Sequence, residues 1–342
     1  MGLIVGELGR ERKRMMKQTT APIDSDDAAP NQACPAASLI ICSRNRPQLL
    51  QETIESVLAG TDVPTEIVVI DQSELPHPIL STLKADRGCT VTYRWTNKPG
   101  VSRARNEGAV IAQHDMLVLI DDDMFVAPDW FGALTRDLLN AGICAVVTGR
   151  VLTADEEGKD GFAPSTIADL YPAVYAGRVR RDVLYSGNMV IQRSVLMTIG
   201  GFDERLGPGT YFPAAEDNDL CFRLLEAGYR VIYAPDAVVY HRPWRASNDH
   251  LRLQRNYGLG QGGFYAKHLD LRDRYMLKRF GSDVAGHVLR SLRLSLRNRA
   301  CAEEDMVYAL GVVTGATRWL LFERAFSRAR IKNSSIQKRG ND

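Results

Sequence analysis

The chain has 342 residues, of which 45% are hydrophobic and 25% are charged, and its formal net charge is +2. These values are typical of a globular protein, and the length predicts two domains or one large domain with an appendage. No stretch reaches the roughly 18 uninterrupted apolar residues that a membrane-spanning helix needs. The nearest candidate, 306–322, is interrupted by Arg318.

Six cysteines lie far apart and form no Cys-x-x-Cys pair: Cys34, Cys42, Cys89, Cys144, Cys221 and Cys301. This spacing favours free thiols in a reducing compartment over a disulfide framework or a zinc site. The sequence therefore predicts a cytoplasmic protein, and contact with the inner face of the cell membrane stays open.

The predicted elements begin after an arm, residues 1–37, that is basic and then rich in Pro, Ala and Asp. Short apolar runs then alternate with helical patterns, which predicts βαβ crossovers and a mostly parallel sheet. The expected strands are 38–42, 66–71, 90–95, 117–120, 143–149, 186–192, 230–234 and 237–240, and the expected helices begin at Pro47, Ser102, Pro128 and Glu216. The pattern is helical from 243 to about 330, and 331–342 is expected to be a disordered tail.

The stretch 117–130, LVLIDDDMFVAPDW, ends a buried strand in three successive carboxylates. Asp121 and Asp123 fall on the same side of an extended chain, and adjacent carboxylates at low dielectric need a cation. This arrangement favours a divalent ion that also binds substrate phosphate oxygens. The alternative is a solvated acidic turn before the helix at Pro128.

Polar residues also follow two other predicted strands, at 42–44 and at Asp71. In open parallel sheets, ligands bind outside the carboxyl ends of the strands, where the strand order reverses. We expect these residues to meet the aspartates of 121–123 in one crevice, which argues against the acidic-turn alternative.

Seven segments, taken in order and spacing, resemble the family 2 glycosyltransferases with a GT-A fold. They are SLIICSRNRPQLLQETIESVL, EIVVIDQS, NKPGVSRARNEG, LIDDDMFVAPDW, SGNMVIQRSVLMTIGGFDE, EDNDLCFRLLEAGYRV and VVYH. The resemblance covers about 38–242 and implies an α/β fold with a Rossmann-like, mostly parallel sheet flanked by helices. It implies a nucleotide-sugar half at 38–123, an acceptor half at 124–242 and, beyond them, a basic helical region at 243–330.

The resemblance also implies where the donor nucleotide binds. Cys42 and Arg44 match the strand-end positions that cradle the nucleotide, and Asp71 matches the acid that recognises the base. Arg105 and Asn106 match an Arg-Asn pair near the donor. Their alternatives are a turn-forming Asp71 and a solvated helix face at Arg105 and Asn106.

For the metal, the resemblance implies Mn²⁺ or Mg²⁺ with Asp123 as the direct ligand. Asp121 and Asp122 would contact ribose or metal-bound water. His241 matches a histidine that completes the metal site, although a lone histidine is also often structural.

For catalysis, the resemblance implies that Asp217 is the base that removes the proton from the acceptor hydroxyl. Asp217 or Asp219 can equally serve as a helix cap, and Glu216 would orient Asp217. The loop 207–214 is expected to cover the acceptor side. There Tyr211 and Phe212 either stack on a sugar ring or pack in the fold.

The C-terminal region is basic, with 13 Lys plus Arg and 4 Asp plus Glu in 242–300. A helix over 283–299 would place Leu289, Leu292 and Leu296 on one stripe beside arginines, which is typical of contact with an anionic membrane surface. The alternative is a helix packed on the catalytic domain. No nucleic-acid module is recognised, and Gly311 and Gly315 favour close helix packing.

The sequence therefore predicts an inverting, metal-dependent glycosyltransferase. It would transfer a sugar from a nucleotide-diphosphate donor to a glycan or lipid-linked hydroxyl, in surface polysaccharide or glycoconjugate synthesis. The competing hypotheses are a sugar-nucleotide nucleotidyltransferase and a catalytically silent glycan- or nucleotide-binding module. The sequence leaves the sugar, the base, the acceptor and the oligomeric state open.

Overall fold

The computed structural model describes residues 35–77, 87–154, 161–163, 165–243, 245–246 and 249–339. Its strands are β1 (Ala37–Ser43), β2 (Glu66–Asp71), β3 (Thr90–Trp95), β4 (Met116–Asp121), β5 (Met124–Val126), β6 (Ala145–Thr153), β7 (Gly161–Phe162), β8 (Ala173–Tyr175), β9 (Asn188–Gln192), β10 (Arg230–His241) and β11 (Arg245–Ala246). Its helices are α2 (Pro47–Leu58), α3 (Val101–Ile111), α4 (Trp130–Ala141), α5 (Arg193–Thr198), α6 (Glu216–Glu226), α7 (His250–Lys267), α8 (Arg274–Leu294) and α9 (Arg299–Arg339). Most of the predicted arm lies outside the described residues.

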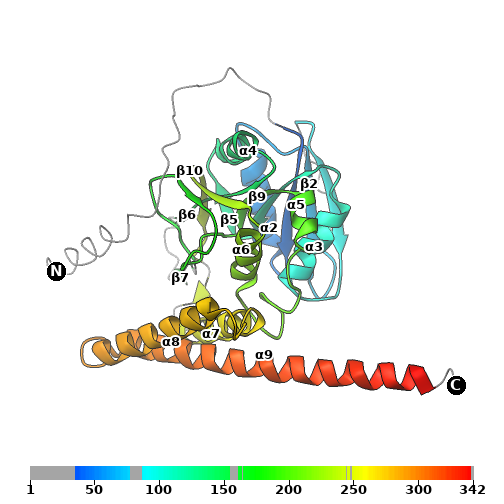
Figure 1. Cartoon of the computed structure of the whole chain (residues 1–342). Coiled ribbons are helices and arrows are strands. Elements are labelled where there is room, and N and C mark those ends of the chain that lie inside the picture. The colour runs from blue at the N-terminus through cyan, green and yellow to red at the C-terminus, as the bar shows by residue number, and fades with distance from the viewer. Residues whose placement is uncertain are drawn as a thin grey trace. The chain divides into compact units, whose positions relative to one another are not determined.

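A sheet in the order β3-β2-β1-β4-β9-β6-β10-β5 forms the centre of the fold, and β8 pairs with β10 at its side (Figure 1). Strands β1 to β4 are parallel neighbours, and β6 is parallel to β10. Strand β9 runs antiparallel to both of its neighbours, β4 and β6. The α/β prediction is therefore confirmed, with one reversed strand in the middle of the sheet.

Alternating side chains of the buried strands pack against helices on opposite faces of the sheet. Leu39 and Ile41 of β1 belong to a core with α2 and α4, whereas Ile40 belongs to a core with α3, α5 and α6. Strands that are buried on both faces have continuous apolar sequences, which is why the positions of these strands could be predicted from the sequence. Helix α3 approaches β1 so closely that a Cβ atom at Gly108 would lie 2.6 Å from Ile40.

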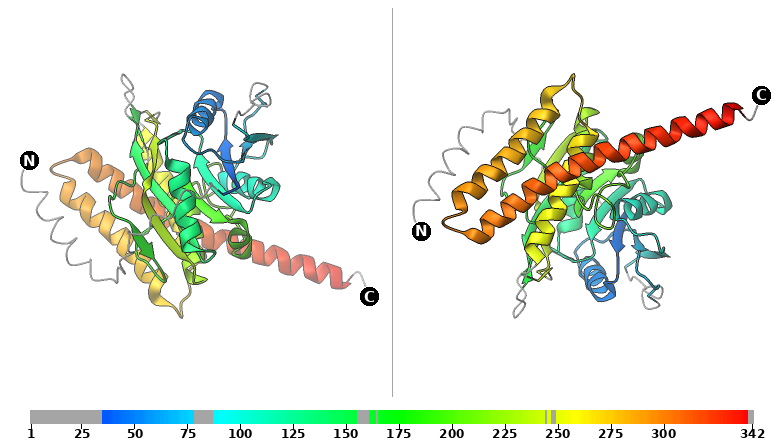
Figure 2. Two further views of the ribbon diagram at one scale, coloured as in Figure 1. Left: turned by 90° about the horizontal axis from the view of Figure 1, so that it is seen from above. Right: turned by 90° about the horizontal axis from the view of Figure 1, so that it is seen from below.

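Helices α7, α8 and α9 form a further layer beside this domain (Figure 2). Phe264 and Tyr265 of α7 share a buried cluster with Met276 of α8 and Val312 of α9. Gly315 of α9 packs directly on α7, because a Cβ atom there would lie 2.1 Å from the carbonyl oxygen of Leu259. The close packing expected at this glycine is confirmed.

Several boundaries differ from the sequence-based expectation: α4 begins at Trp130 and not at Pro128, β6 runs over Ala145–Thr153 and not 143–149, and three larger differences follow. The two strands expected around Pro235 are one strand, β10, whose pairing with β6 shifts register between Ala234 and Val238. The helix expected over 283–299 is interrupted, because α8 ends at Leu294 and α9 begins at Arg299. Helix α9 then continues to Arg339, through most of the segment expected to be a tail.

Within the described residues, no helix is both long enough and apolar enough to cross a bilayer. The cysteines in this part of the chain are all free, as their spacing predicts.

Candidate active site

The carboxyl ends of β1, β2 and β4 lie side by side, as the sequence predicts. Cys42 is the register partner of Asp121, and Ser43 is the register partner of Asp71. Burial raises the pKa of the Cys42 thiol to about 12, so this side chain is a neutral S–H group at the floor of the site. Arg44 is exposed in the turn that follows β1.

Arg105 joins the end of β4 to the start of α6. Its guanidinium lies 2.9 Å from Asp121, 3.4 Å from Glu216 and 3.6 Å from Asp217, and its side chain is only 6% exposed. The three carboxylates raise the pKa of Arg105 despite its burial, so the side chain stays cationic. One buried cation therefore holds together acids from the two halves of the domain.

Asp217 begins α6 together with Glu216, directly after Ala215 in a left-handed backbone conformation with φ of 69°. The backbone N–H of Ser186 donates to Asp217 at 3.2 Å, and the Ser186 hydroxyl donates to the same carboxylate. Burial raises the pKa of Asp217, and Arg105 partly opposes this shift. A buried carboxylate whose proton affinity is raised is suited to accept a proton.

Glu216, the other acid at the start of α6, also has a raised pKa. Burial, followed by the negative charge of Asp217, raises the pKa of Glu216 to about 7. Its side chain is 11% exposed, compared with 18% for Asp217, so Asp217 is the more accessible carboxylate.

Asp122 and Asp123 are both paired with Arg46, a residue that the sequence analysis did not select. The Arg46 guanidinium lies 2.6 Å from Asp122 and 3.0 Å from Asp123. Burial raises the pKa of Asp122 to about 7, and Arg46 opposes the shift. In the sequence, the one feature that could have indicated Arg46 is its position in SRNRPQ, immediately before the proline that begins α2.

His241, at the end of β10, lies beside Asp123. Its Nε2 atom is 3.6 Å from the Asp123 carboxylate, and its Nδ1 atom is 3.1 Å from the carbonyl oxygen of Ser165. A carbonyl acceptor places the ring proton on Nδ1 in the neutral form, which leaves Nε2 as a metal-binding lone pair. Asp123 and His241 are therefore two neighbouring side chains of the kind that bind a divalent cation, although the described residues contain no cluster of three or more such groups.

Tyr185 is a second residue that the sequence analysis did not select. Its hydroxyl donates to Asp121 at 3.0 Å, and burial raises its pKa well above the usual range, so it remains a donor. Tyr185 precedes the reversed strand β9, and a search restricted to residues that follow strands misses it.

Asp71 and Asn106 are held by neighbouring parts of the chain. Asp71 is buried and accepts hydrogen bonds from the Ser73 N–H at 2.9 Å and from the Tyr93 hydroxyl at 2.6 Å. The amide of Asn106 bonds both the N–H and the carbonyl of Phe202, at 2.8 and 2.9 Å. Asn106 thus fixes the turn before the acceptor loop, whereas the carboxylate cluster is bound by Arg105.

The acceptor loop contains one packed and one exposed aromatic residue. Phe212 is buried against Trp319 of α9, with ring centroids 4.9 Å apart. Tyr211 is 61% exposed and lines a cavity of about 260 Å³ together with Arg103, Glu204 and Phe322. Of the two roles considered for this pair, packing applies to Phe212, and Tyr211 faces the cavity.

Asp219 ties α6 to the helical layer. Its buried carboxylate contacts Arg223 at 2.7 Å, Lys267 at 2.6 Å and His268 at 2.7 Å. Hydrogen bonding and these cations lower its pKa against the effect of burial. Asp219 is thus a structural junction.

Comparison with known proteins agrees with the geometry. The family model described as glycosyl transferase family 2 matches residues 38–199. A glucosyl-dolichyl phosphate glucuronosyltransferase from Haloferax volcanii is 31% identical over 216 residues, which cover 60% of this chain and 68% of the relative. A pre-mycofactocin glycosyltransferase from Mycobacterium tuberculosis is 26% identical over 272 residues, which cover 77% of this chain but only 54% of the relative.

Among solved structures, a mannosyltransferase from Pyrobaculum calidifontis aligns with a TM-score of 0.56 at 17% identity, and the alignment covers 92% of this chain and 94% of that one. This likeness supports the GT-A fold. The sequence relatives show that the chain is a glycosyltransferase and belongs to glycosyltransferase family 2.

Proposed function

We propose that this glycosyltransferase moves a sugar, with inversion, from a nucleotide-diphosphate sugar to a hydroxyl of a glycan or lipid-linked acceptor, with Mn²⁺ or Mg²⁺ as cofactor. The observation that carries the proposal is the bridge that Arg105 makes from Asp121 to Asp217. It places the end of the donor half beside a carboxylate of the acceptor half, as a single displacement between two substrates requires.

Asp123 and His241 would hold the metal ion, whose positive charge stabilises the diphosphate leaving group. The mannosyltransferase from Pyrobaculum was solved in complex with GDP-mannose and Mn²⁺. In this chain the proposed metal site rests on Asp123 and His241. The Nδ1 atom of His241 is bonded to the carbonyl oxygen of Ser165, which leaves Nε2 for the metal.

Asp217 would take the proton of the acceptor hydroxyl. The two hydrogen bonds from Ser186 orient its carboxylate, and burial raises its proton affinity. Arg105 supplies a positive charge beside Asp217, and Glu216 supplies a neighbouring carboxyl group. These contacts would hold Asp217 in place while the proton passes to its carboxylate oxygen.

Cys42, Arg44 and Asp71 would form the nucleotide pocket, with Asp121 and Asp122 near ribose or metal-bound water. Asp71 Oδ1 accepts two hydrogen bonds from Ser73, and Oδ2 accepts one from Tyr93, so one lone pair of Oδ2 remains, which suits recognition of one N–H group on a base. Asn106, expected to lie near the donor, would instead support the acceptor side through the turn at Phe202.

We also propose that the cavity beside Tyr211 binds a part of the acceptor remote from the reacting hydroxyl, because none of the carboxylates around Arg105 lines this cavity. An exposed tyrosine ring can stack on a sugar, and Arg103 and Glu204 at the cavity wall can bond hydroxyl groups. The name of the Haloferax relative indicates a lipid-linked substrate for that protein, which favours a lipid-linked acceptor here, at the inner face of the membrane.

The deciding experiment is donor binding by thermal shift, with a panel of nucleotide-diphosphate sugars tested with and without Mn²⁺. A donor at one hundred times its Kd stabilises the fold by about 2.7 kcal/mol. We expect a metal-dependent shift that Asp123→Ala abolishes. The matched control is Asp115→Ala, because Asp115 is 91% exposed and directly precedes the opposite end of the same strand.

Turnover separates the transferase from its competitors. Asp217→Asn should retain donor binding and lose roughly 10²- to 10⁴-fold in rate, measured as release of the nucleoside diphosphate. A wild-type protein that binds donor but never turns over would be the silent module. A stabilising response to nucleoside triphosphates alone would favour the nucleotidyltransferase, although the turn after β1 lacks the glycines of a phosphate-binding loop.

A further inference from the structure

The outer faces of α8 and α9 carry exposed leucines that the catalytic proposal leaves unused. On α8, Leu289 and Leu292 are 53% and 62% exposed. On α9, the exposed apolar residues recur at helical spacing: Leu310, Val313, Leu320 and Leu321. Exposed apolar side chains gathered on neighbouring helices mark an interaction surface.

These leucines face away from the protein interior. The opposite side of α8 packs inward through Met276, Phe280 and Val284, and the opposite side of α9 packs through Val312 and Trp319. The view from below shows α8 and α9 lying side by side in front of the rest of the fold (Figure 2, right). Within the described residues, the exposed stripes therefore lie on the outer side of the helical layer.

The charge beside the leucines indicates what this face binds. Residues 274–299 contain seven Lys plus Arg and one Asp, and Lys278, Arg290 and Arg293 are exposed. The single acid, Asp283, turns inward to the hydroxyls of Tyr265 and Tyr308. An apolar stripe flanked by cations fits the interface of an anionic bilayer.

We propose that the outer faces of α8 and α9 dock the enzyme on an anionic lipid bilayer, without crossing it. A second copy of the chain fits this surface less well, because a two-fold contact through one patch would bring the same arginines together.

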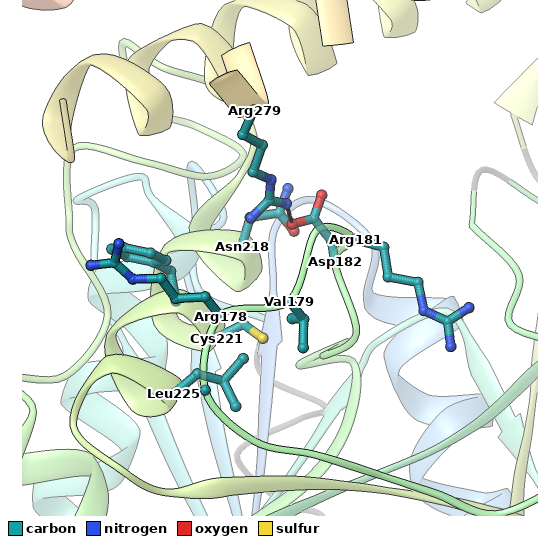
Figure 3. Close-up of a pocket in the computed structure, with 10 residues that line it drawn as sticks. Arg178, Val179, Arg181, Asp182, Asn218, Cys221, Leu225 and Arg279 are labelled. Atoms are coloured by element: carbon teal, nitrogen blue, oxygen red, sulfur yellow. Dashed lines mark hydrogen bonds and ion pairs between the residues drawn. The ribbon is translucent and has the colours of Figure 1, made fainter. Parts of the chain in front are cut away.

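The helical layer is joined to the catalytic domain by side-chain contacts, so docking would also position the active site. Arg279 of α8, whose side chain is 9% exposed, pairs with Asp182, three residues before Tyr185, as the close-up shows (Figure 3). On α7, Gln261 accepts a hydrogen bond at 2.6 Å from Asn218, the neighbour of Asp217. Asp217 would thereby be held at a set distance from the bilayer, which suits an acceptor that is anchored in lipid. This part of the proposal rests on the proposed function.

The test is co-sedimentation of the full chain with vesicles of phosphatidylcholine alone or of phosphatidylcholine mixed with phosphatidylglycerol. We expect binding to the mixed vesicles that falls as salt is raised. The double variant Leu289→Glu with Leu292→Glu should lower partitioning roughly tenfold or more, and Arg293→Gln with Arg297→Gln should lower it by a similar factor only on anionic vesicles.

Two control variants match these changes on the catalytic domain. Leu75→Glu alters a leucine that is 75% exposed, and Arg136→Gln alters an exposed arginine of α4; both should bind vesicles like the wild type. All of the altered side chains are exposed, and the thermal shift with donor and Mn²⁺ reports whether the active site is intact.

The proposal is overturned if the wild type ignores anionic vesicles, or if the leucine variant binds them as well as the wild type does. A wild-type dimer that the leucine variant converts to a monomer, without vesicle binding, would instead assign this face to self-association. Vesicle binding without any donor response would leave the docking face standing and would refute the proposed catalytic function alone.

Discussion

The guanidinium of Arg46 lies 2.6 Å from the buried carboxylate of Asp122, and the same group reaches Asp123 at 3.0 Å. Arg46 therefore supplies the positive charge that two adjacent aspartates require in this structure. It stands at the place where the sequence predicts a divalent cation, so the guanidinium and a metal ion would serve the same carboxylates.

Replacing Arg46 should make the fold depend on the metal. Arg46→Gln removes a counter-ion that is 30% exposed, so we expect a loss of about 1–3 kcal/mol in chelator, reduced from the fully buried case by solvent screening. Added Mn²⁺ should restore more stability to this variant than it adds to the wild type. Denaturant unfolding with and without Mn²⁺ measures both quantities, and equal metal effects on the two proteins would contradict the prediction.

Arg105 should tolerate no replacement that removes its charge. Arg105→Met leaves Asp121, Glu216 and Asp217 without their shared cation, which should cost about 3–5 kcal/mol. Arg105→Lys keeps the charge but not the forked geometry, so it should recover part of the stability while turnover stays low. Unfolding curves and nucleotide release rates would show this split. A lysine variant with full activity would show that only the charge matters.

The stability of the protein should depend on Glu216 near neutral pH. The pKa of Glu216 is about 7 in the folded protein against 4.5 ordinarily, so the folded state holds its proton longer than the unfolded state. Stability is therefore lost as pH rises from about 4.5 to 7, by about 3 kcal/mol for the full shift. Glu216→Gln should remove this loss, so that above pH 7 the free energy of unfolding of the variant rises relative to that of the wild type.

Unfolding at a series of pH values tests this prediction. Glu74→Gln, at an exposed position, should give a curve parallel to that of the wild type. A Glu216→Gln curve that is also parallel would mean that Glu216 is already ionised throughout this range.

Two glycines of the helical layer should respond to alanine in opposite directions. Gly315→Ala forces a Cβ atom to within 2.1 Å of the Leu259 carbonyl oxygen, and such overpacking costs about 1–3 kcal/mol. At Gly286 of α8, a Cβ atom would meet nothing within 4 Å, so Gly286→Ala should stabilise by about 0.5–1 kcal/mol. Thermal unfolding of both variants gives the comparison, and a harmless Gly315→Ala would show that α9 can move away from α7.

The sequence was most informative where a side chain's role follows from its place on a regular element. The ends of β1, β2 and β4 could be predicted because buried parallel strands leave continuous apolar runs. Arg46 could not, because it lies in an irregular turn and its partners are 76 and 77 residues away in the chain. Tertiary contacts of that separation leave no local pattern.

The same reasoning explains the error at the end of α8. Leu289, Leu292 and Leu296 keep helical spacing, and periodicity alone continues the helix to 299. The structure ends it at Leu294, and the side chain of Asn298 accepts a hydrogen bond from the Cys301 N–H at the start of α9. Capping by an asparagine competes with helix continuation, and the apolar stripe gave no sign of it.

The reversed strand β9 has a consequence for how substrates enter. Because β9 is hydrogen-bonded to both β4 and β6, residues 38–123 and 124–242 contribute to one uninterrupted sheet, and this pairing opposes a hinge rotation between them. The loop before α6 is fastened to α3 by the Val101 N–H to Pro208 carbonyl bond at 3.0 Å and the Ser102 hydroxyl to Leu206 carbonyl bond at 2.7 Å. We expect that release of these two bonds lets the loop rearrange locally while the strand pairing of the sheet is kept.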